Sequence, residues 1–251
     1  MKLRKYLIAS LTCALALSLV MLAPQLAHAQ SISINAGGAD GGTTTRIIQM
    51  IVLITVISLA PSLLMMVTSF MRIIIVLSFV RSALGTQTTP PNQVLVALAL
   101  FLTFFIMAPT FDKAYTDGIQ PWIEEKIDQK TAITKAAAPF HDFMMQHVRE
   151  KDLALFMDMR NLKVDKPEDT PYQALIPAFM ISELKRAFEI GFLIFIPFLI
   201  IDMVVASVLM AMGMMMLPPV VMSLPFKIIF FVLIDGWYMV AGSLVRSFGA
   251  S

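Results

Sequence analysis

The apolar stretch from residue 190 to residue 246 constrains this chain more than any other feature. Only three charged side chains interrupt it, Asp202, Lys227 and Asp235. A charge at the centre of a bilayer costs roughly 2.5–3.5 kcal/mol on insertion scales, so such a residue needs a structural or functional reason. The chain is 58% apolar and 14% charged, against about 45–50% and 25% in soluble domains. The pattern predicts membrane-embedded helices, and the net charge of +2 gives no argument for nucleic acid.

The first residues predict a cleavable signal peptide over residues 1–29. Basic residues precede a long apolar run, and Ala-His-Ala ends at Ala29, so cleavage is expected between Ala29 and Gln30. An uncleaved signal anchor is the alternative. The only cysteine, Cys13, lies inside the apolar run, which excludes a disulfide or a thiolate metal site in the mature chain. Residues 30–45 are rich in Gly and Thr and predict a flexible linker.

Residues 46–111 predict a first hydrophobic hairpin. Residues 47–71 and 91–111 are uncharged and long enough to span a bilayer. We expect Pro61 to kink the first span, and residues 81–92 to form the turn. Gly85 is the expected C-terminal cap of the helix before that turn.

Residues 112–185 form a polar segment in which acidic and basic residues are nearly balanced. Apolar spacing predicts two or three amphipathic helices, broken at Pro121, at Pro139 and at the loop 162–171. Thr170 and Pro171 have the order of an N-cap and a first helical residue. They predict the start of a helix that runs into the third span.

Residues 186–251 predict a second hydrophobic hairpin with spans at about 186–212 and 219–246. We expect Pro177 and Pro197 to kink the helix that forms the third span. The fold class is therefore an all-α membrane protein with two long hydrophobic hairpins, about four spans, separated by a polar helical segment. With an exported N-terminus, both hairpin turns face the cytoplasm and residues 112–185 lie outside.

Asp202 and Lys227 are predicted to form an ion pair across the second hairpin. At 1.5 Å per residue, Asp202 lies roughly 16 Å from Gly213 and Lys227 roughly 12 Å from the other end of the turn, so their depths nearly match. The pair would clamp the hairpin closed at a mobile pore wall. The alternative is a structural ion pair without a role in transport.

Asp235 needs another partner, because the same arithmetic places it roughly 24 Å from Pro219. A neighbouring subunit or the arginines of the first hairpin, Arg72 and Arg81, could provide it; the alternative is a carboxylate near the outer interface. For the arginines themselves we expect side chains that extend to the cytoplasmic interface. An aspartyl protease needs two carboxylates about 3 Å apart, and the depth offset between Asp202 and Asp235 argues against one.

Methionines crowd the turn of the second hairpin. The turn also contains the expected hinge residues Gly213, Pro218 and Pro219. Methionine is flexible and polarizable, and it fills irregular apolar space. If the hairpin repeats around an axis, the thioethers would form a ring that blocks ions and parts for a polypeptide; otherwise they simply fill a core. The predicted gasket residues are Met210, Met212, Met214, Met215 and Met216.

No sequence motif indicates an enzyme, a cofactor or a metal site. His141 and His147 have poor spacing for two ligands on one helix, and no phosphate-binding loop or nucleophile elbow is present. A small-solute or ion transporter would also explain intramembrane charges, but it predicts a polar cavity at mid-bilayer that the methionine turn does not provide.

Two segments resemble a known family. The sequence SFMRIIIVLSFVRSALGTQTTPPNQVLVALALFLTFFIMAP (69–109) closely resembles the first signature of the FliP family of flagellar export-gate proteins. The sequence FIPFLIIDMVVASVLMAMGMMMLPPVVMSLPFKIIFFVLIDGW (195–237) resembles the second. Virulence type III secretion systems have counterparts of similar pattern. The cleavable signal favours the flagellar branch.

The resemblance implies an inner-membrane, non-enzymatic pore subunit of the flagellar basal body. Several copies would assemble with FliQ-like and FliR-like proteins into the entry of a channel for unfolded flagellar subunits. It also implies that the hairpins can pack in an assembly raised out of the bilayer, and that the methionine-rich loop seals the pore. Energy for transport would come from other components.

Overall fold

The computed structural model describes residues 67–249, except 87, 163, 165, 215 and 216, together with separate positions between 48 and 66. The predicted signal peptide, its cleavage position at Ala29 and Gln30, the linker and much of the first predicted span lie outside the described residues. The chain divides into two units after Thr55, and the description below concerns the second. The secondary structure of its described residues is helical throughout, without a strand, which confirms the all-α class.

The first hairpin consists of α3 (Phe70–Ala83) and α4 (Asn92–Ala114). The turn between them begins as predicted, because Gly85 has φ +79° and its N–H donates to the Ser82 carbonyl at 3.0 Å. The Thr86 hydroxyl donates to the Arg81 carbonyl at 3.2 Å and satisfies another free group at this helix end. Glycine is needed here because a left-handed backbone is unfavourable for a residue with a Cβ.

Pro121 does not break the chain into a new helix, contrary to our prediction. α4 continues through a π-helical turn, η2 (Tyr115–Ile119), into α5 (Gln120–Ile123). In an α-helix a proline ring clashes with the carbonyl four residues earlier. The π turn directly before Pro121 has wider spacing, with the Gln120 N–H bonded to the Tyr115 carbonyl. The continuous helix therefore extends beyond the predicted apolar span 91–111, to residue 123.

The polar segment folds into α6 (Gln129–His147) and α7 (Glu150–Met159). The Asp128 carboxylate caps α6 by accepting from the backbone N–H of Lys130 at 3.1 Å and of Thr131 at 3.4 Å. Pro139 lies inside α6, so the predicted break there is wrong. The predicted break at the loop 162–171 is confirmed, because α7 ends before this loop and the next α-helix begins after it. Within the loop the structure has only the short η3 (Pro167–Asp169).

The third predicted span lies within α8 (Tyr172–Ala211), a continuous helix of 40 residues. α8 begins directly after Pro171, one residue later than predicted, so Pro171 and not Thr170 occupies the N-cap position. The Thr170 side chain makes no capping bond, and its carbonyl accepts from His141. Pro177 and Pro197 lie inside α8 without ending it. At 1.5 Å per residue α8 is roughly 60 Å long, about twice the hydrocarbon thickness of a bilayer.

The fourth predicted span is not one helix. α9 (Pro219–Leu233) and α10 (Gly236–Arg246) meet at an angle of 62°. At the bend Asp235 adopts a left-handed backbone with φ 50° and ψ 54°. A Cβ on Gly236 would lie 2.2 Å from the Phe231 ring, so the bend is tightly packed.

Two described helices are long and apolar enough to cross a membrane, residues 92–123 and 172–211. The bent pair α9 and α10 could be a third span. The layout of four spans in two hairpins is not confirmed.

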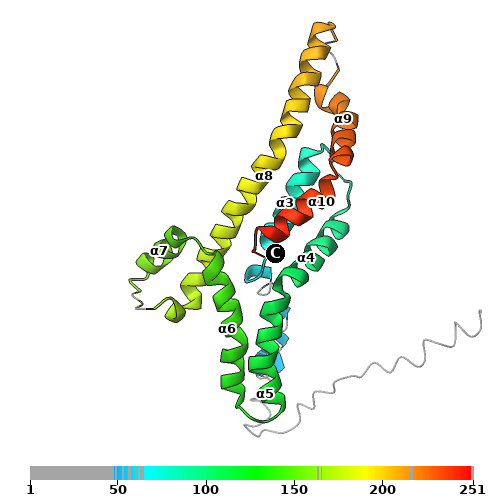
Figure 1. Ribbon diagram of the computed structural model, residues 1–251. Coiled ribbons are helices and arrows are strands. Elements are labelled where there is room, and N and C mark those ends of the chain that lie inside the picture. The colour runs from blue at the N-terminus through cyan, green and yellow to red at the C-terminus, as the bar shows by residue number, and fades with distance from the viewer. Residues whose placement is uncertain are drawn as a thin grey trace, which may run out of the picture. The chain divides into compact units, whose positions relative to one another are not determined.

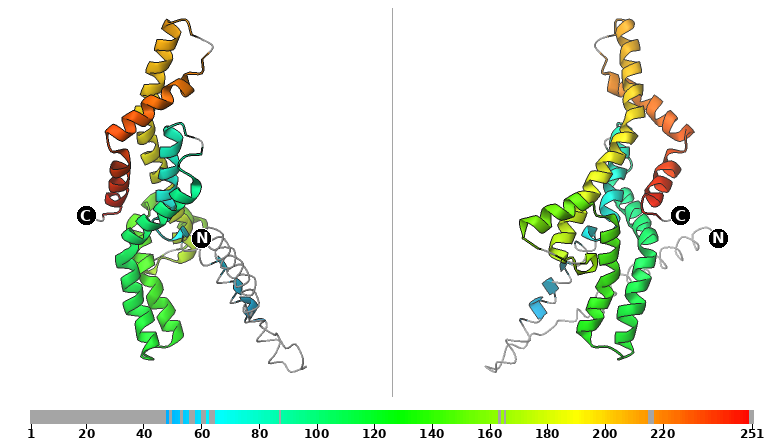
Figure 2. Two further views of the ribbon diagram at one scale, coloured as in Figure 1. Left: turned by 90° about the vertical axis from the view of Figure 1, so that its right-hand side faces the viewer. Right: turned by 60° about the vertical axis from the view of Figure 1, so that its left-hand side comes forward.

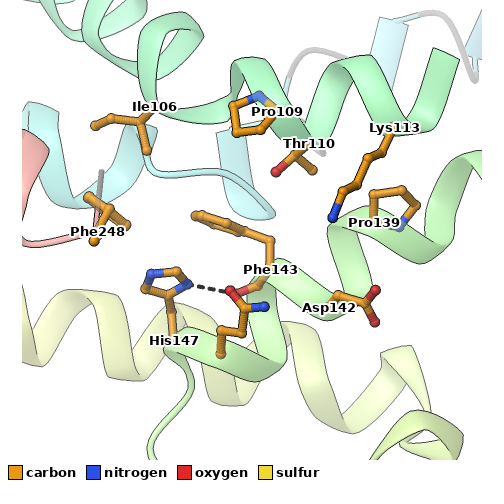
Figure 3. Close-up of a pocket in the computed structure, with 11 residues that line it drawn as sticks. Ile106, Pro109, Thr110, Lys113, Pro139, Asp142, Phe143, His147 and Phe248 are labelled. Carbon is orange, nitrogen blue, oxygen red and sulfur yellow. Dashed lines mark hydrogen bonds between the residues drawn. The ribbon is translucent and has the colours of Figure 1, made fainter. Parts of the chain in front are cut away.

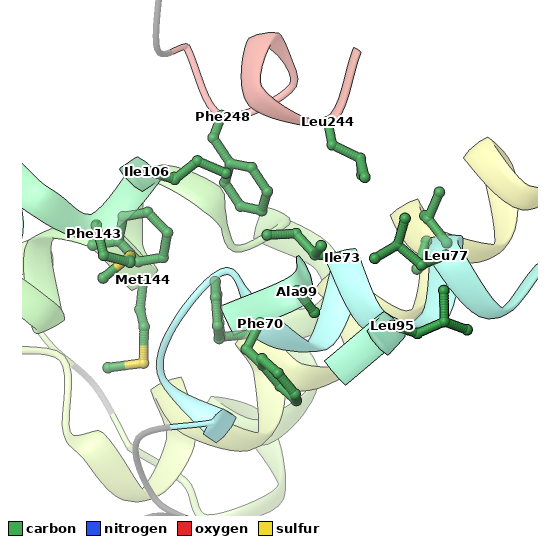
Figure 4. Close-up of a cluster of buried hydrophobic side chains, with 14 of the residues drawn as sticks. Phe70, Ile73, Leu77, Leu95, Ala99, Ile106, Phe143, Met144, Leu244 and Phe248 are labelled. Atoms are coloured by element: carbon green, nitrogen blue, oxygen red, sulfur yellow. The ribbon is translucent and has the colours of Figure 1, made fainter. Parts of the chain in front are cut away.

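The core forms around α3, which packs most extensively against α8 and also against α4 (Figure 1). Figure 4 shows Ile73 and Leu77 of α3 beside Leu95 and Ala99 of α4, with Leu244 of α10 and Phe248 on the other side. A second cluster joins the end of α3 to Phe198 of α8 and Phe231 of α9. In both views of Figure 2, α6 runs alongside α4 and α5.

Candidate functional site

Asp202 and Lys227 form the predicted ion pair between α8 and α9. Lys227 Nζ lies 2.6 Å from Asp202 Oδ2, and the lysine is buried. The Ser223 hydroxyl donates to the other carboxylate oxygen, Oδ1. Sequence reasoning missed Ser223, although its position four residues before Lys227 places both on one helix face. Each oxygen of Asp202 therefore has a partner that compensates for the loss of water.

The pair lies against the turn of the first hairpin. A Cβ on Gly85 would be 4.0 Å from Lys227 Nζ and 4.0 Å from a methyl group of Leu224. The end of α3, α8 and α9 thus meet at one level.

Asp235 has no ion pair and no side-chain hydrogen bond with the described part of the chain. Its carboxylate is exposed at the bend between α9 and α10. Neither Arg72 nor Arg81 pairs with it, so the predicted pairing with the first hairpin does not occur within one molecule. Asp202 interacts with an ammonium and a hydroxyl group rather than with a second carboxylate, which is not the geometry of an aspartyl protease.

Arg72 is buried in the core, and the prediction that it extends to the membrane interface is wrong. Its Nε donates to Glu183 Oε2 at 2.8 Å and its Nη2 to Glu183 Oε1, a bidentate ion pair with a fully buried carboxylate. Glu183 was overlooked because it lies in the polar part of the sequence. It follows Phe179 by four residues, however, and so lies on the apolar face of α8.

The Arg72 guanidinium also binds the turn after α10. Nη1 donates to the Ser247 carbonyl at 3.1 Å and to its hydroxyl at 2.9 Å. The guanidinium carbon lies 3.6 Å from the centre of the Phe248 ring. Arg72 therefore joins α3, α8 and the end of α10.

Arg81 stabilises the turn of the first hairpin. Its Nη1 donates to the Asn92 side-chain oxygen and to the Pro90 carbonyl at 3.4 Å. Nε and Nη2 make no hydrogen bond with the residues that the structure describes. Arg81 is half-buried, and the donors on this side of its guanidinium are not used by the described residues.

The methionine-rich turn closes the tip of the second hairpin (Figure 1). Gly213 has φ +76°; its N–H donates to the Met210 carbonyl, and the Met214 N–H donates to the Leu209 carbonyl, both at 3.0 Å. This is the Schellman pattern that ends a helix at a glycine. Pro218 and Pro219 then start α9.

The thioethers near this turn are accessible. Met210 is 57% exposed and Met212 65% exposed, whereas Met214 is half-buried. Met215 and Met216 lie outside the described residues. The role of the five methionines as a gasket stays a prediction.

A cavity of about 230 Å³ lies between α4, α6 and the turn after α10 (Figure 3). Its wall includes Lys113, Asp142 and His147. The His147 Nδ1–H donates to the Phe143 carbonyl at 2.8 Å. Burial lowers the pKa of His147, partly offset by that bond, so the ring is neutral near neutral pH. The described residues contain no cluster of side chains that could hold a metal ion.

These features define an all-helical membrane protein whose hairpins are fastened by buried ion pairs. Residues 53–244 match the FliP family. The flagellar biosynthetic protein FliP of Bacillus subtilis is 58% identical over 84% of this chain and 96% of its own length. FliP of Caulobacter vibrioides is 54% identical over 98% and 92%, and FliP of Agrobacterium fabrum 49% identical over 92% and 97%. The chain belongs to the FliP family.

Proposed function

We propose that this chain is a pore-forming core subunit of the bacterial flagellar type III export apparatus. It passes unfolded flagellar subunits across the inner membrane as part of the basal body. The observation that carries the proposal is the high identity to flagellar biosynthetic proteins along nearly their whole length. All the relatives described above are named as flagellar proteins, which favours the flagellum over a virulence secretion system.

The apolar lining of the cavities between the spanning helices disfavours a small-solute transporter. A cavity of about 540 Å³ between α8 and α9 is lined by aliphatic residues, Met222 and Phe226. A cavity of about 370 Å³ at the bend of α9 and α10 has a similar lining. A polar solute would lose its hydration there without gaining hydrogen bonds.

Several copies assemble with FliQ-like and FliR-like membrane proteins, and the subunit itself catalyses no reaction. Two hairpins, with four spanning segments in all, contribute to this assembly. The length of α8 supports a complex raised partly out of the bilayer, because a helix about twice the membrane thickness must lie partly outside the hydrocarbon. Orientation follows the predicted exported N-terminus, with both hairpin turns towards the cytoplasm.

The methionine-rich turn acts as the seal of the pore. Its support is the exposure of Met210 and Met212 at a hairpin tip, where a flexible apolar ring can exclude ions yet part for a polypeptide. Replacing residues 210–216 by a short Gly-Ser turn tests this role, with flagellin secretion and small-ion leakage measured together. Met203→Ser is the matched control, since Met203 is exposed on the same helix away from the turn.

Leaky membranes with retained secretion would establish the seal. Tight membranes with lost secretion would contradict it and make the turn an assembly or gating element.

The ion pair of Asp202 and Lys227 clamps the second hairpin. Removing one partner leaves an uncompensated buried charge, at a cost of about 3–5 kcal/mol. We expect Asp202→Asn and Lys227→Gln each to lower the amount of assembled protein and flagellin secretion. The exchange Asp202→Lys with Lys227→Asp should recover part of both. A purely structural pair would give normal secretion per assembled complex in every variant.

The function itself is tested by deleting the gene and measuring flagellin in the medium. Loss of secreted flagellin with normal growth on varied carbon sources supports export, and complementation with the full chain should restore it. Normal flagellin secretion in the deletion strain would overturn the proposal.

A further inference from the structure

The bend between α9 and α10 exposes an isolated carboxylate surrounded by apolar side chains. We call this the α9–α10 corner, defined by Val232, Leu233, Asp235 and Tyr238. Leu233 is 80% exposed and Tyr238 73% exposed. The Asp235 carboxylate has no partner in the described part of the chain and does not cap α10. In an apolar environment such a charge is costly unless another molecule supplies a cation.

The backbone at Asp235 gives a second indication. A residue other than glycine with φ 50° costs roughly 1–2 kcal/mol relative to a right-handed conformation. Such strain persists where the surroundings hold it in place, and it is often associated with function. Here it turns α10 away from α9 by 62° and leaves Asp235 exposed at the bend.

A groove on the side of α3 that faces away from α9 and α10 offers a surface complementary to the α9–α10 corner. The α3–α8 groove has a volume of about 390 Å³ and is lined by Ile74, Ile75, Ser78, Phe79, Ser82 and Phe188. Arg81 follows Ile74 by seven residues and Ser78 by three, so it extends the same helix face. Its Nε and Nη2 are unused by the described residues, which leaves a cation at the end of an apolar groove.

The corner and the groove lie on different sides of α3. Val76 points into the cavity that α9 and α10 line, whereas Ile74 and Ser78 line the groove. A contact between the corner of one copy and the groove of another is therefore heterologous. Repetition of such a contact closes into a ring or continues as a helical array.

The two charges lie at compatible depths. Gly85 lies at the level of Lys227, as the 4.0 Å approach shows, and Val80 shares a buried cluster with Phe231. Arg81 lies four residues from Gly85 along α3, roughly 6 Å, and Asp235 lies eight residues from Lys227 in the chain, roughly 12 Å. Both displacements lead away from the methionine-rich turn. The remaining offset of roughly 6 Å is within the reach of an extended arginine side chain. Arg186 lies close to Arg72, and Arg246 lies in the last turn of α10, at the end opposite to Asp235.

We propose that the α9–α10 corner of one copy docks in the α3–α8 groove of a second copy, with Asp235 paired to Arg81 of that copy. This inference rests on the proposed function in one respect, since it specifies how copies of the subunit contact one another. The contact desolvates the corner and satisfies both charges. It also links the bend next to the clamp of Asp202 and Lys227 to the first hairpin of the neighbour.

Cysteine cross-linking in cell membranes tests the contact with the full chain. The reporter carries Leu233→Cys and Ser82→Cys in a Cys13→Ser background, because both sites are exposed and both charges are retained. We expect oxidation to give a ladder of linked copies, with none from either single variant. The matched control is Leu233→Cys with Val94→Cys, another exposed site outside the groove, and it should give no ladder.

Charge variants in the reporter decide whether the ion pair holds the contact. Asp235→Asn keeps a side chain that tolerates the left-handed backbone, and it should lower the cross-link yield severalfold. Asp235→Arg with Arg81→Asp should restore the yield relative to Asp235→Arg alone. An unchanged yield in Asp235→Asn, or a disulfide from residue 233 to a different protein only, would overturn the proposal.

Flagellin secretion measured in the same cells separates this contact from the proposed function. Cross-linked copies without secretion in the parental background would contradict the export function and leave the contact standing. Secretion without cross-linked copies would refute the contact alone.

Discussion

At the scale of single residues, the structure shows that charge in this apolar chain is paired internally where it is buried. Arg72 and Glu183 share two hydrogen bonds, and Asp202 is shared between Lys227 and Ser223. Such pairs satisfy each charge where water is excluded, and removal of one partner costs more than the pair itself contributes. The exposed Asp235 is the contrasting case, because its carboxylate has no ion pair and no side-chain hydrogen bond with the described residues.

Glu183→Gln should destabilise the protein by about 3–5 kcal/mol, because the Arg72 charge would remain buried without its counterion. Arg72→Met combined with Glu183→Leu should lose less, since no charge is left unpaired. Thermal unfolding in detergent measures both. Lys185→Gln is the control: it removes an exposed ion pair with Glu189 at 3.1 Å and should change stability by no more than about 1 kcal/mol. A double variant as unstable as Glu183→Gln would contradict this account.

The stability of the region around α6 should fall as the pH falls below about 6.5, the ordinary pKa of histidine. Burial lowers the pKa of His147 in the folded protein, so below this pH the unfolded chain binds a proton that the folded chain does not. The stabilisation is fully present above that pH and is lost progressively on acidification. Unfolding midpoints between pH 8 and pH 5 measure it. His147→Gln should flatten the dependence; an equal slope in this variant would assign the effect to other groups.

At the scale of elements, sequence reasoning predicted where helices exist better than where they end. The hairpin turns at Gly85 and Gly213 were predictable, because a helix end that needs a left-handed residue favours glycine. Pro121 and Pro139 were expected to break helices, and neither does. Pro177 and Pro197 were expected to kink the helix of the third span, and they lie inside α8 without ending it. Tertiary packing and the π turn before Pro121 compensate for the missing N–H groups.

The pairing of buried charges could likewise be predicted from the sequence only in part. The pairing of Asp202 with Lys227 could be predicted because a single short turn fixes their relative depth. The pairing of Arg72 with Glu183 joins residues that are 111 positions apart, and no local pattern specifies how α3 and α8 pack. The bend at Asp235 was also missed, although Asp235 and Gly236 form a dipeptide typical of turns, because the long apolar run around them favoured one continuous span.

Gly118→Ala should destabilise the contact between η2 and α6 by about 1–3 kcal/mol, the usual range for overpacking. A Cβ at residue 118 would lie 2.6 Å from the backbone nitrogen of Ala136, which cannot move without distorting α6. Gly213→Ala is the matched control, because a Cβ there has no neighbour within 4 Å and only backbone strain is added. Hydrogen exchange of α6 amides measures the difference. Equal protection in the two variants would refute tight packing at Gly118.

At the scale of the whole molecule, the length of α8 limits how the protein can sit in a bilayer. Only about 20 residues of a helix are needed to cross the hydrocarbon, whereas α8 has 40. Polar groups are concentrated in its first half, where Glu183 and Ser182 fasten it to α3 and α7. The second half contains Asp202 and leads to the methionine-rich turn. The half that carries the ion pair with α9 is therefore the part expected to lie in the membrane of an isolated subunit.

Cysteine scanning along α8 in liposomes should reveal one protected window of about 20 residues. Single cysteines at Ile181, Phe188, Leu193, Val204 and Met210 sample exposed positions along the length of α8. We expect a membrane-impermeant maleimide to label residue 181 rapidly and residues 193 and 204 slowly, because hydrocarbon excludes the reagent. Labelling after detergent solubilisation is the control for thiol reactivity. Slow labelling at residue 181 as well would place the whole of α8 in an apolar environment. The length of α8 would then need an explanation other than a complex raised partly out of the bilayer.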